Sequence, residues 1–193
     1  MHYGEQIKTV FEKEIASLEN VKDTIDDSID DIISVLCNCK GKVVFSGVGK
    51  SGHISAKIAS TFSSLGTPSI FMHPAEARHG DLGLLDSNDV VVLVSYSGES
   101  REITDLLPYI KLKSITTIAI TGNNDSTLYR ECDFAYCFPE IEEATRYGLA
   151  PTSSTTSLLV LGDALAIVLA EQKGFQKEDF ATLHPGGVLG KCV

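Results

Sequence analysis

Three serines follow directly on an apolar segment in the middle of the chain. The run Val90–Val94 is continuously apolar, and "SYSGES" at 95–100 then places Ser95, Ser97 and Ser100 within six residues. Each serine can donate a hydroxyl proton, and a helix beginning near Ser100 would add free backbone N–H groups. Such a set can hold a phosphate monoester without a nucleotide or a metal ion. The alternative is a plain strand-to-helix turn in which Ser100 serves as the N-cap.

A second loop of this kind, "SGVGKSGH" at 46–53, follows an earlier apolar segment. Its glycines allow a ligand to approach the backbone closely, while Ser51 offers a hydroxyl and Lys50 a positive charge. "GVGKSG" at 47–52 has the spacing of a dinucleotide fingerprint, but no acidic residue follows the next strand, "SIFMHP", to bind a ribose. Two serine-containing loops after two strands therefore favour a phosphate pocket over a nucleotide site.

The elements that must position these loops alternate between strand and helix. "KVVFSG", "SIFM", "VVVLVS", "TTIAIT" and "FAYCF" are short and mostly apolar on both faces, which is typical of a parallel sheet covered on both sides. Helix-like segments lie at about 50–65, 100–113, 125–131 and 153–173. The sequence thus predicts a three-layer α/β sandwich with a five-stranded parallel sheet, whose ligands gather at the carboxyl ends of the strands.

The first 40 residues have a different pattern. Apolar residues recur from Ile7 to Leu36 at a mean spacing of about 3.6, which predicts one long amphipathic helix or a pair. This apolar stripe is long for a helix that covers only its own domain, so we expect it to take part in a homotetramer. With no linker in the chain, we expect one domain over residues 1–193, in which the helical segment 1–40 packs on or beside the core 41–193.

Composition restricts the possible partners. A net charge of −10 disfavours a nucleic-acid-binding surface, and the chain lacks both a signal-peptide core and 18 consecutive apolar residues. We therefore expect a cytoplasmic protein without membrane or nucleic-acid partners. No cofactor and no metal site are expected, because the histidines and cysteines lack ligand spacing. The cysteines should be buried, reduced thiols: Cys37, Cys39, Cys132, Cys137 and Cys192.

Longer strings give the sequence a family resemblance. "GVGKSGH", "HPAEARHGDLGLL", "SGES", "GLAPTSSTTSLLVLGDALA" and "FATLHPGGVLGK" resemble the sugar isomerase (SIS) domain family, in particular its D-arabinose 5-phosphate isomerases, over about residues 41–191. The resemblance implies a flavodoxin-like SIS fold, a tetramer, and interconversion of D-ribulose 5-phosphate and D-arabinose 5-phosphate. It further implies a supply of 3-deoxy-D-manno-octulosonate for lipopolysaccharide or capsule. Most members continue into CBS domains, which are not expected here, since the chain stops at Val193.

The resemblance also implies roles for particular residues. The catalytic positions would be Lys50, His79, Glu102, Glu143 and His184, and the phosphate-binding positions Ser51, Ser95, Ser97 and Ser100. Aldose–ketose isomerisation needs a carboxylate or histidine that moves a proton between adjacent carbons, and an acid/base for ring opening. We expect Glu143 to move the proton. The ring-opening residue is His184 or His79, and His79 could reach a neighbouring subunit's pocket.

Two other functions stay open at this point. A 6-phospho-3-hexuloisomerase would share the domain, although the "HGDLG", "LAPTSSTT" and "HPGG" strings disfavour it. A non-catalytic sugar-phosphate sensor would keep the serine loops without needing Glu143, His79 and His184. The chain also departs from the expected family pattern after Glu143, where Ala144-Thr145-Arg146-Tyr147 replaces Ala-Cys-Pro-Leu. This departure bears on substrate preference more than on the chemistry.

Overall fold

Five parallel strands form the centre of the structure, a computed structural model that describes residues 3–186. The strand order β2-β1-β3-β4-β5 is flavodoxin-like, as predicted. All five strands occur where the apolar segments predicted them: β1 Val43–Gly47, β2 Ser69–Phe71, β3 Val90–Val94, β4 Thr116–Thr121 and β5 Phe134–Cys137. The predicted fold class is therefore confirmed.

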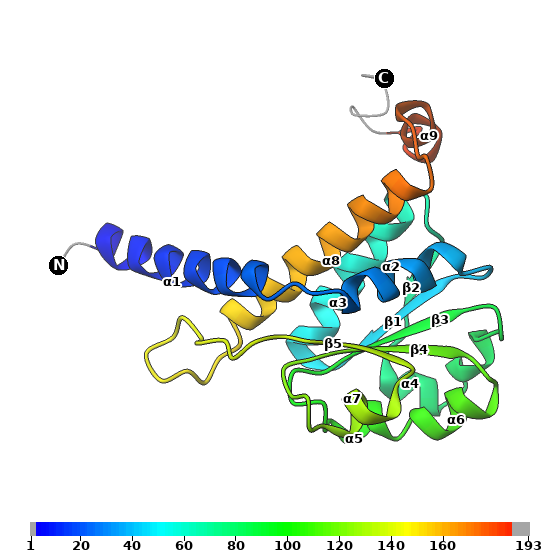
Figure 1. The fold of residues 1–193 in the computed structure, drawn as a ribbon, viewed down its shortest axis with the longest axis horizontal. Coiled ribbons are helices and arrows are strands. Elements are labelled where there is room, and N and C mark those ends of the chain that lie inside the picture. The colour runs from blue at the N-terminus through cyan, green and yellow to red at the C-terminus, as the bar shows by residue number, and fades with distance from the viewer. Residues whose placement is uncertain (1–2, 187–193) are drawn as a thin grey trace.

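Helices cover both faces of this sheet (Figure 1). They are α1 Tyr3–Asp23, α2 Ser28–Asn38, α3 Gly49–Ser64, α4 Pro74–Arg78, the 3₁₀ turn η1 Asp81–Leu84, α5 Arg101–Thr104, α6 Leu107–Leu112, α7 Thr127–Glu131, α8 Ser153–Gln172 and α9 Lys177–Leu183. One layer holds α2, α3 and α8, and the other holds α4 to α7. The segment 100–113, expected to be one helix, is the two short helices α5 and α6, because Pro108 begins a new helix at its N-terminus.

Alternate residues of each strand enter two separate cores. Phe45 and Val92 pack with α3 and α8 residues in one core, whereas Val44 and Leu93 pack with α5 and α6 residues in the other. Every residue of β1 and β3 is buried, since side chains of successive residues point to opposite, covered faces. This two-sided burial explains why the strands are continuously apolar in sequence.

The register places the ends of three strands side by side. Gly47 of β1 pairs with Val94 of β3, which in turn pairs with Ile120 of β4. The loops that leave β1, β3 and β4 therefore start at one edge of the sheet, where both serine-containing loops lie. The close approach of α3 to β1 explains one glycine of "GVGKSG", because a Cβ on Gly52 would lie 2.6 Å from the Gly47 carbonyl oxygen.

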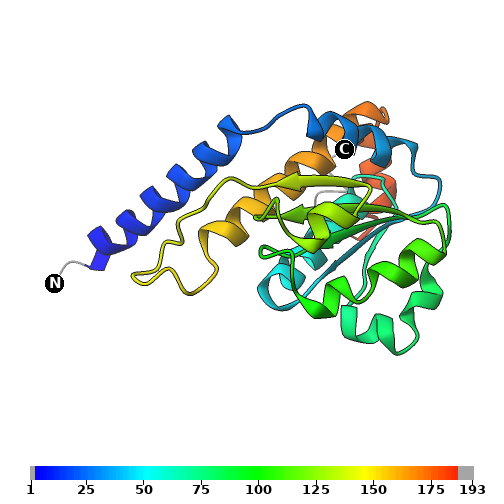
Figure 2. The same ribbon diagram turned by 60° about the horizontal axis from the view of Figure 1, so that its bottom comes forward.

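The N-terminal segment is a pair of helices, one of the two predicted arrangements. α2 packs on the sheet, while α1 projects from the domain and contacts the first turns of α8 (Figure 2). Of the 21 residues of α1, only Ser17 and Val21 are buried. Large apolar side chains of α1 are consequently exposed: Tyr3, Ile7, Val10, Phe11 and Ile15.

The helix α8 is long and apolar enough, by length and composition alone, to cross a membrane. In this structure 56% of its most apolar window is buried, and its leucines pack in the core beside α3. Gly162 of α8 allows this close packing, because a Cβ there would collide with the Ile58 side chain of α3. The apolar character of α8 is accounted for by the interior of the α/β sandwich.

Candidate active site

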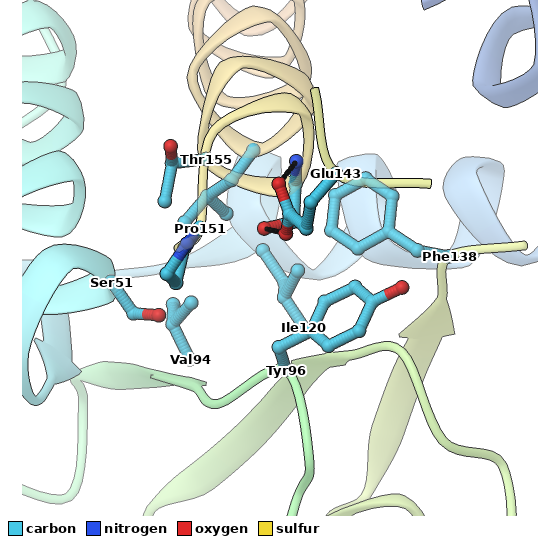
Figure 3. A pocket seen from close by; sticks show the side chains of 10 residues that line it. Ser51, Val94, Tyr96, Ile120, Phe138, Glu143, Pro151 and Thr155 are labelled. Atoms are coloured by element: carbon cyan, nitrogen blue, oxygen red, sulfur yellow. Dashed lines mark hydrogen bonds between the residues drawn. The ribbon is translucent and has the colours of Figure 1, made fainter. Parts of the chain in front are cut away.

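A small cavity lies where the carboxyl ends of β3 and β4 meet the first turns of α3 and α8. Its volume is about 90 Å³, and Figure 3 shows the side chains around it. The lining residues are Ser51, Val94, Tyr96, Ile120, Phe138, Glu143, Pro151, Ser154, Thr155 and Leu158. The cavity thus combines an apolar floor with a carboxylate and hydroxyl groups, at the edge of the sheet where a ligand was predicted to bind.

Glu143 is the acidic residue on the wall of this cavity. Its Oε2 accepts hydrogen bonds from the Thr152 amide at 2.6 Å and the Thr152 hydroxyl at 2.9 Å. The Ser154 hydroxyl donates to Oε1, and the Ser154 amide donates to Oε2 at 3.4 Å. These donors belong to the N-terminus of α8, whose free N–H groups and positive dipole end favour an anion.

These contacts decide the ionisation of Glu143. Burial raises its pKa, but the hydrogen bonds from Ser154 and Thr152 outweigh burial and hold the pKa below the ordinary value of 4.5. The side chain is therefore an ionised carboxylate at neutral pH, ready to accept a proton. The same bonds also cap α8, so Glu143 has a structural role alongside any chemical one.

Ser95, Ser97 and Ser100 come together in the turn that follows β3. The Ser95 hydroxyl lies 2.9 Å from the Ser100 hydroxyl and 3.4 Å from that of Ser97, and it accepts from the Gly98 amide at 3.2 Å. Gly98 adopts a φ of 67° in this turn, a conformation that suits glycine. Ser100 is the N-cap of α5, but its side chain makes no capping bond, since its hydroxyl pairs with Ser95.

This hydroxyl cluster borders the cavity. Val94 and Tyr96, the neighbours of Ser95 in the chain, both line it, and Ser51 lines it from the first turn of α3. Ser95 is buried, whereas Ser97 is exposed. The Ser95 hydroxyl lies within hydrogen-bonding distance of the other two, and three hydroxyls grouped in this way form a site that could accept an oxyanion.

Tyr96 is a lining residue that sequence reasoning did not single out. Its hydroxyl accepts a hydrogen bond from the Ile141 amide at 3.3 Å, and its ring packs over Gly122, where a Cβ would collide with it. Burial raises the pKa of Tyr96, so the phenol is neutral and can donate a hydrogen bond. Its place between Ser95 and Ser97 in "SYSGES" is the signal that could have identified it.

Sequence reasoning also missed Ser154 and Thr155, which lie in "PTSSTTS" ahead of an apolar run. Both line the cavity from the first turn of α8. Hydroxyl residues at a helix start are commonly capping residues, and this interpretation concealed the contact of Ser154 with Glu143. Only the arrangement of α8 against the loop reveals that contact.

With this geometry in place, the chain can be compared with known proteins. The sequence pattern described as SIS domain matches residues 36–168. The chain belongs to the SIS domain family. Residues 36–168 of this SIS chain contain all five strands, the cavity wall and most of α8.

Particular relatives within the family are more similar. Arabinose 5-phosphate isomerase KdsD of Escherichia coli K12 is 52% identical over 171 residues, covering 86% of this chain and 52% of that protein. The KdsD of Francisella tularensis is 46% identical over 193 residues, covering 98% of this chain and 59% of that protein. The chain therefore spans about half the length of the curated relatives it matches.

Solved structures agree with the fold. An Escherichia coli CFT073 protein in complex with arabinose 5-phosphate has a TM-score of 0.90 and 46% identity, covering 93% of this chain and 95% of that chain. The Vibrio vulnificus NanR protein complexed with ManNAc-6P has a TM-score of 0.79 at 19% identity, covering 94% of this chain and 70% of that chain, which shows the shared fold alone. The SIS fold predicted from the sequence is confirmed by these comparisons.

Of the nine predicted site residues, Ser51 and Glu143 line the cavity and the other seven do not. Lys50, beside Ser51, and Glu102, in the first turn of α5, are both exposed. His79 is exposed at the C-cap of α4. The structure therefore brings Glu143 and Ser51 to one cavity and groups Ser95, Ser97 and Ser100 in the adjoining turn after β3. Lys50, Glu102 and the two histidines do not line the cavity of their own chain.

His184 and Glu143 lie at opposite ends of α8. His184 is the C-cap of α9, its Nδ1 lies 2.9 Å from the Phe180 carbonyl oxygen, and its ring stacks on Phe180 at 3.9 Å. α9 follows the C-terminus of α8, whereas Glu143 contacts its N-terminus (Figure 1). A 20-residue helix is about 30 Å long, so His184 cannot reach Glu143 of the same chain.

The cysteines and acidic residues form no metal site in the part of the chain described. Within residues 3–186, no group of three or more histidine, cysteine or acidic side chains is arranged to hold a metal ion. Four cysteines are free thiols, as predicted, but they are partly buried rather than fully buried: Cys37, Cys39, Cys132 and Cys137. Cys192 lies outside the described residues, so its predicted state stays a prediction.

Proposed function

We propose that this chain catalyses the interconversion of D-ribulose 5-phosphate and D-arabinose 5-phosphate through an enediol intermediate. The observation that carries the proposal is an ionised carboxylate, Glu143, on the wall of a cavity that also borders a cluster of three serine hydroxyls. Similarity to proteins named arabinose 5-phosphate isomerase, and to a structure in complex with arabinose 5-phosphate, supports this substrate.

Glu143 is assigned the proton transfer between C1 and C2. The reaction removes a proton beside a carbonyl group and returns it to the neighbouring carbon, which one carboxylate can do from one position. Hydrogen bonds from the α8 N-terminus keep this carboxylate ionised and fix its direction. Glu102 is the alternative base, and its exposed position in α5 makes it the weaker choice in an isolated chain.

The phosphate end of the substrate is assigned to the two serine-containing loops. Ser51 lies in the first turn of α3, where backbone amides have no intrahelical partner. Ser95, Ser97 and Ser100 follow the neighbouring strand β3 at the same edge of the sheet. Lys50 would supply a positive charge beside the phosphate. This phosphate is unchanged through the reaction, so its contacts contribute mainly uniform binding.

The histidines are assigned to pockets of other subunits within a homotetramer. Ring opening of arabinose 5-phosphate needs an acid/base, and neither His79 nor His184 lines the cavity of its own chain. Tyr3, Ile7 and Phe11 of α1 are 68%, 58% and 65% exposed, and a second copy of the chain is the partner that would cover them. Assembly would bring a histidine from one copy to the pocket of another.

The proposed role is to supply arabinose 5-phosphate in the cytoplasm for 3-deoxy-D-manno-octulosonate, a component of lipopolysaccharide or capsule. The product is a five-carbon sugar phosphate that a condensing enzyme must extend to an eight-carbon acid. Similarity to KdsD proteins supports this role, and the reaction itself requires no NAD or ATP.

Product analysis with ribulose 5-phosphate tests the proposal. We expect purified protein to form arabinose 5-phosphate, which chromatography separates from the substrate. Glu143→Gln should lower kcat by about 100-fold or more, and the exchange of the C1 hydrogen with solvent should be lost with it. Glu140→Gln is the matched control, because its exposed side chain lies in the same loop.

Two results would contradict the proposal. Folded protein at high concentration that yields no arabinose 5-phosphate would exclude the activity, and a panel including 3-hexulose 6-phosphate would then identify the alternative isomerase. Binding of sugar phosphate without turnover of any substrate would indicate a sensor. Near-normal kcat in Glu143→Gln would instead move the role of base to Glu102 or to a histidine.

A further inference from the structure

The helix α1 is attached to the loop that carries Glu143 through single polar contacts. The Asn20 side-chain amide donates to the Glu140 carbonyl oxygen at 3.1 Å, three residues before Glu143. Glu14 accepts a hydrogen bond from the Thr156 hydroxyl at the start of α8. An exposed ion pair joins Lys13 to Glu142 at 3.6 Å, and in such a position it contributes little.

Packing between α1 and the loop is incomplete beside Glu140. A cavity of about 230 Å³ lies between α1 and the loop, lined by Lys13, Ala16, Ser17, Asn20, Glu140 and Glu142. The loop and α1 lie on the same side of the domain in both views (Figures 1 and 2). Side chains do not fill this space, so the Asn20 bond ties the loop to α1 at Glu140. One residue further on, Ile141 is buried in the core that also contains Val21 of α1.

We propose that Asn20 is a positioning residue for Glu143, acting through the Glu140 carbonyl. The inference rests on the proposed function, in which Glu143 is the base. The segment 140–143 is then held at three points in succession. Asn20 holds Glu140, the Tyr96 hydroxyl accepts from the Ile141 amide, and the α8 N-terminus holds the Glu143 carboxylate.

Loss of the Asn20 bond should change the direction in which the Glu143 carboxylate points, while the carboxylate stays in the cavity. Thr152 and Ser154 still hold Glu143 near α8, so the charge stays in the cavity. Acidic side chains at 140, 142 and 143 repel one another, which favours movement of the loop once Asn20 no longer holds it. A base displaced by a fraction of an ångström loses transition-state contact, whereas the serine loops that bind phosphate are on other elements.

The test compares Asn20→Ala with Asn38→Ala in the full chain. Asn38 donates its side-chain amide to the Ser34 carbonyl oxygen at 2.9 Å within α2, so it is an exposed bond of the same kind away from the loop. We expect Asn20→Ala to lower kcat about five-fold with KM unchanged within about two-fold, and Asn38→Ala to change neither. Asn20→Gln, which keeps the amide donor, should recover most of kcat.

Hydrogen–deuterium exchange gives a readout that does not depend on activity. Backbone amides at 139–145 should exchange faster in Asn20→Ala than in the unmodified protein or in Asn38→Ala. Unchanged exchange, or an equal loss of kcat in both variants, overturns the inference. If the unmodified protein lacks isomerase activity while exchange still increases in Asn20→Ala alone, the proposed function fails and the positioning of the loop by Asn20 stands.

Discussion

Removal of the Ser154 hydroxyl should move the acid limb of the pH–activity profile to higher pH. This hydroxyl donates to Oε1 of Glu143, and after burial, which raises the pKa, it is the largest influence on that carboxylate. In Ser154→Ala, burial continues to favour the neutral acid while one opposing bond is lost, so the pKa of Glu143 should rise. Glu143 would then become protonated, and inactive as a base, at a higher pH.

The size of the effect follows from the bonds that remain. A hydrogen bond to a charged acceptor contributes about 1.5–3 kcal/mol, and about 1.4 kcal/mol corresponds to a ten-fold change in an equilibrium constant. The Thr152 amide, the Thr152 hydroxyl and the Ser154 amide still donate to Oε2, and water can reach the half-buried side chain. We therefore expect the acid midpoint of kcat/KM to move up by about one pH unit.

The assay measures kcat/KM between pH 4 and 8 at nanomolar enzyme, because the sequence pI of about 4.9 favours precipitation at higher concentration. Ser157→Ala is the matched control: this buried serine of α8 has a hydroxyl without a hydrogen-bond partner among residues 3–186. Circular dichroism at each pH checks that the variants stay folded. An acid midpoint equal to that of the unmodified protein would refute the reasoning, as would an equal shift in Ser157→Ala.

Three further predictions follow from the same structure. Ser97→Ala should raise KM about ten-fold with kcat unchanged, since it removes a hydroxyl that we propose binds the phosphate; an unchanged KM would mean that "SYSGES" is only a turn. Light scattering at micromolar concentration should give the mass of a tetramer, and Phe11→Glu should lower that mass; a monomeric mass for the unmodified protein would exclude the assembly. Burial raises the pKa of Asp89, but hydrogen bonds from Lys42 and Asp86 outweigh burial and hold this pKa below the ordinary value. The ionised Asp89 carboxylate therefore stabilises the fold fully above its unfolded pKa near 3.8, and this stabilisation is lost as the pH falls through the lower folded pKa. Asp89→Asn should then destabilise the fold by about 2–3 kcal/mol in urea at pH 7 and by less at pH 3, and an equal difference at both pH values would contradict this.

Much of the fold could be predicted from the sequence, because its determinants are local. Five short runs such as "VVVLV" are mostly apolar on both faces, and a strand covered on both sides explains this. The helices 49–64, 127–131 and 153–172 occur within a few residues of the predicted segments. The short helices α4 and α9 and the 3₁₀ turn η1 were not predicted.

Part of the candidate site could also be predicted from the sequence, and part could not. That Ser95, Ser97 and Ser100 would be neighbours follows from their spacing after a strand, and the parallel order of β1 and β3 brings Ser51 to the same edge. By contrast, the contact of Glu143 with Thr152 and Ser154 joins residues 9 and 11 positions apart across an irregular loop, which no periodic pattern describes. The sequence by itself determined which side chains are available and at which edge of the sheet they gather. Only the tertiary structure decided that the N-terminus of α8 lies at Glu143 and that Asn20 of α1 reaches the Glu140 carbonyl. It also decided that His184 lies one helix length from Glu143. These three arrangements depend on how whole helices pack, which no local sequence pattern describes.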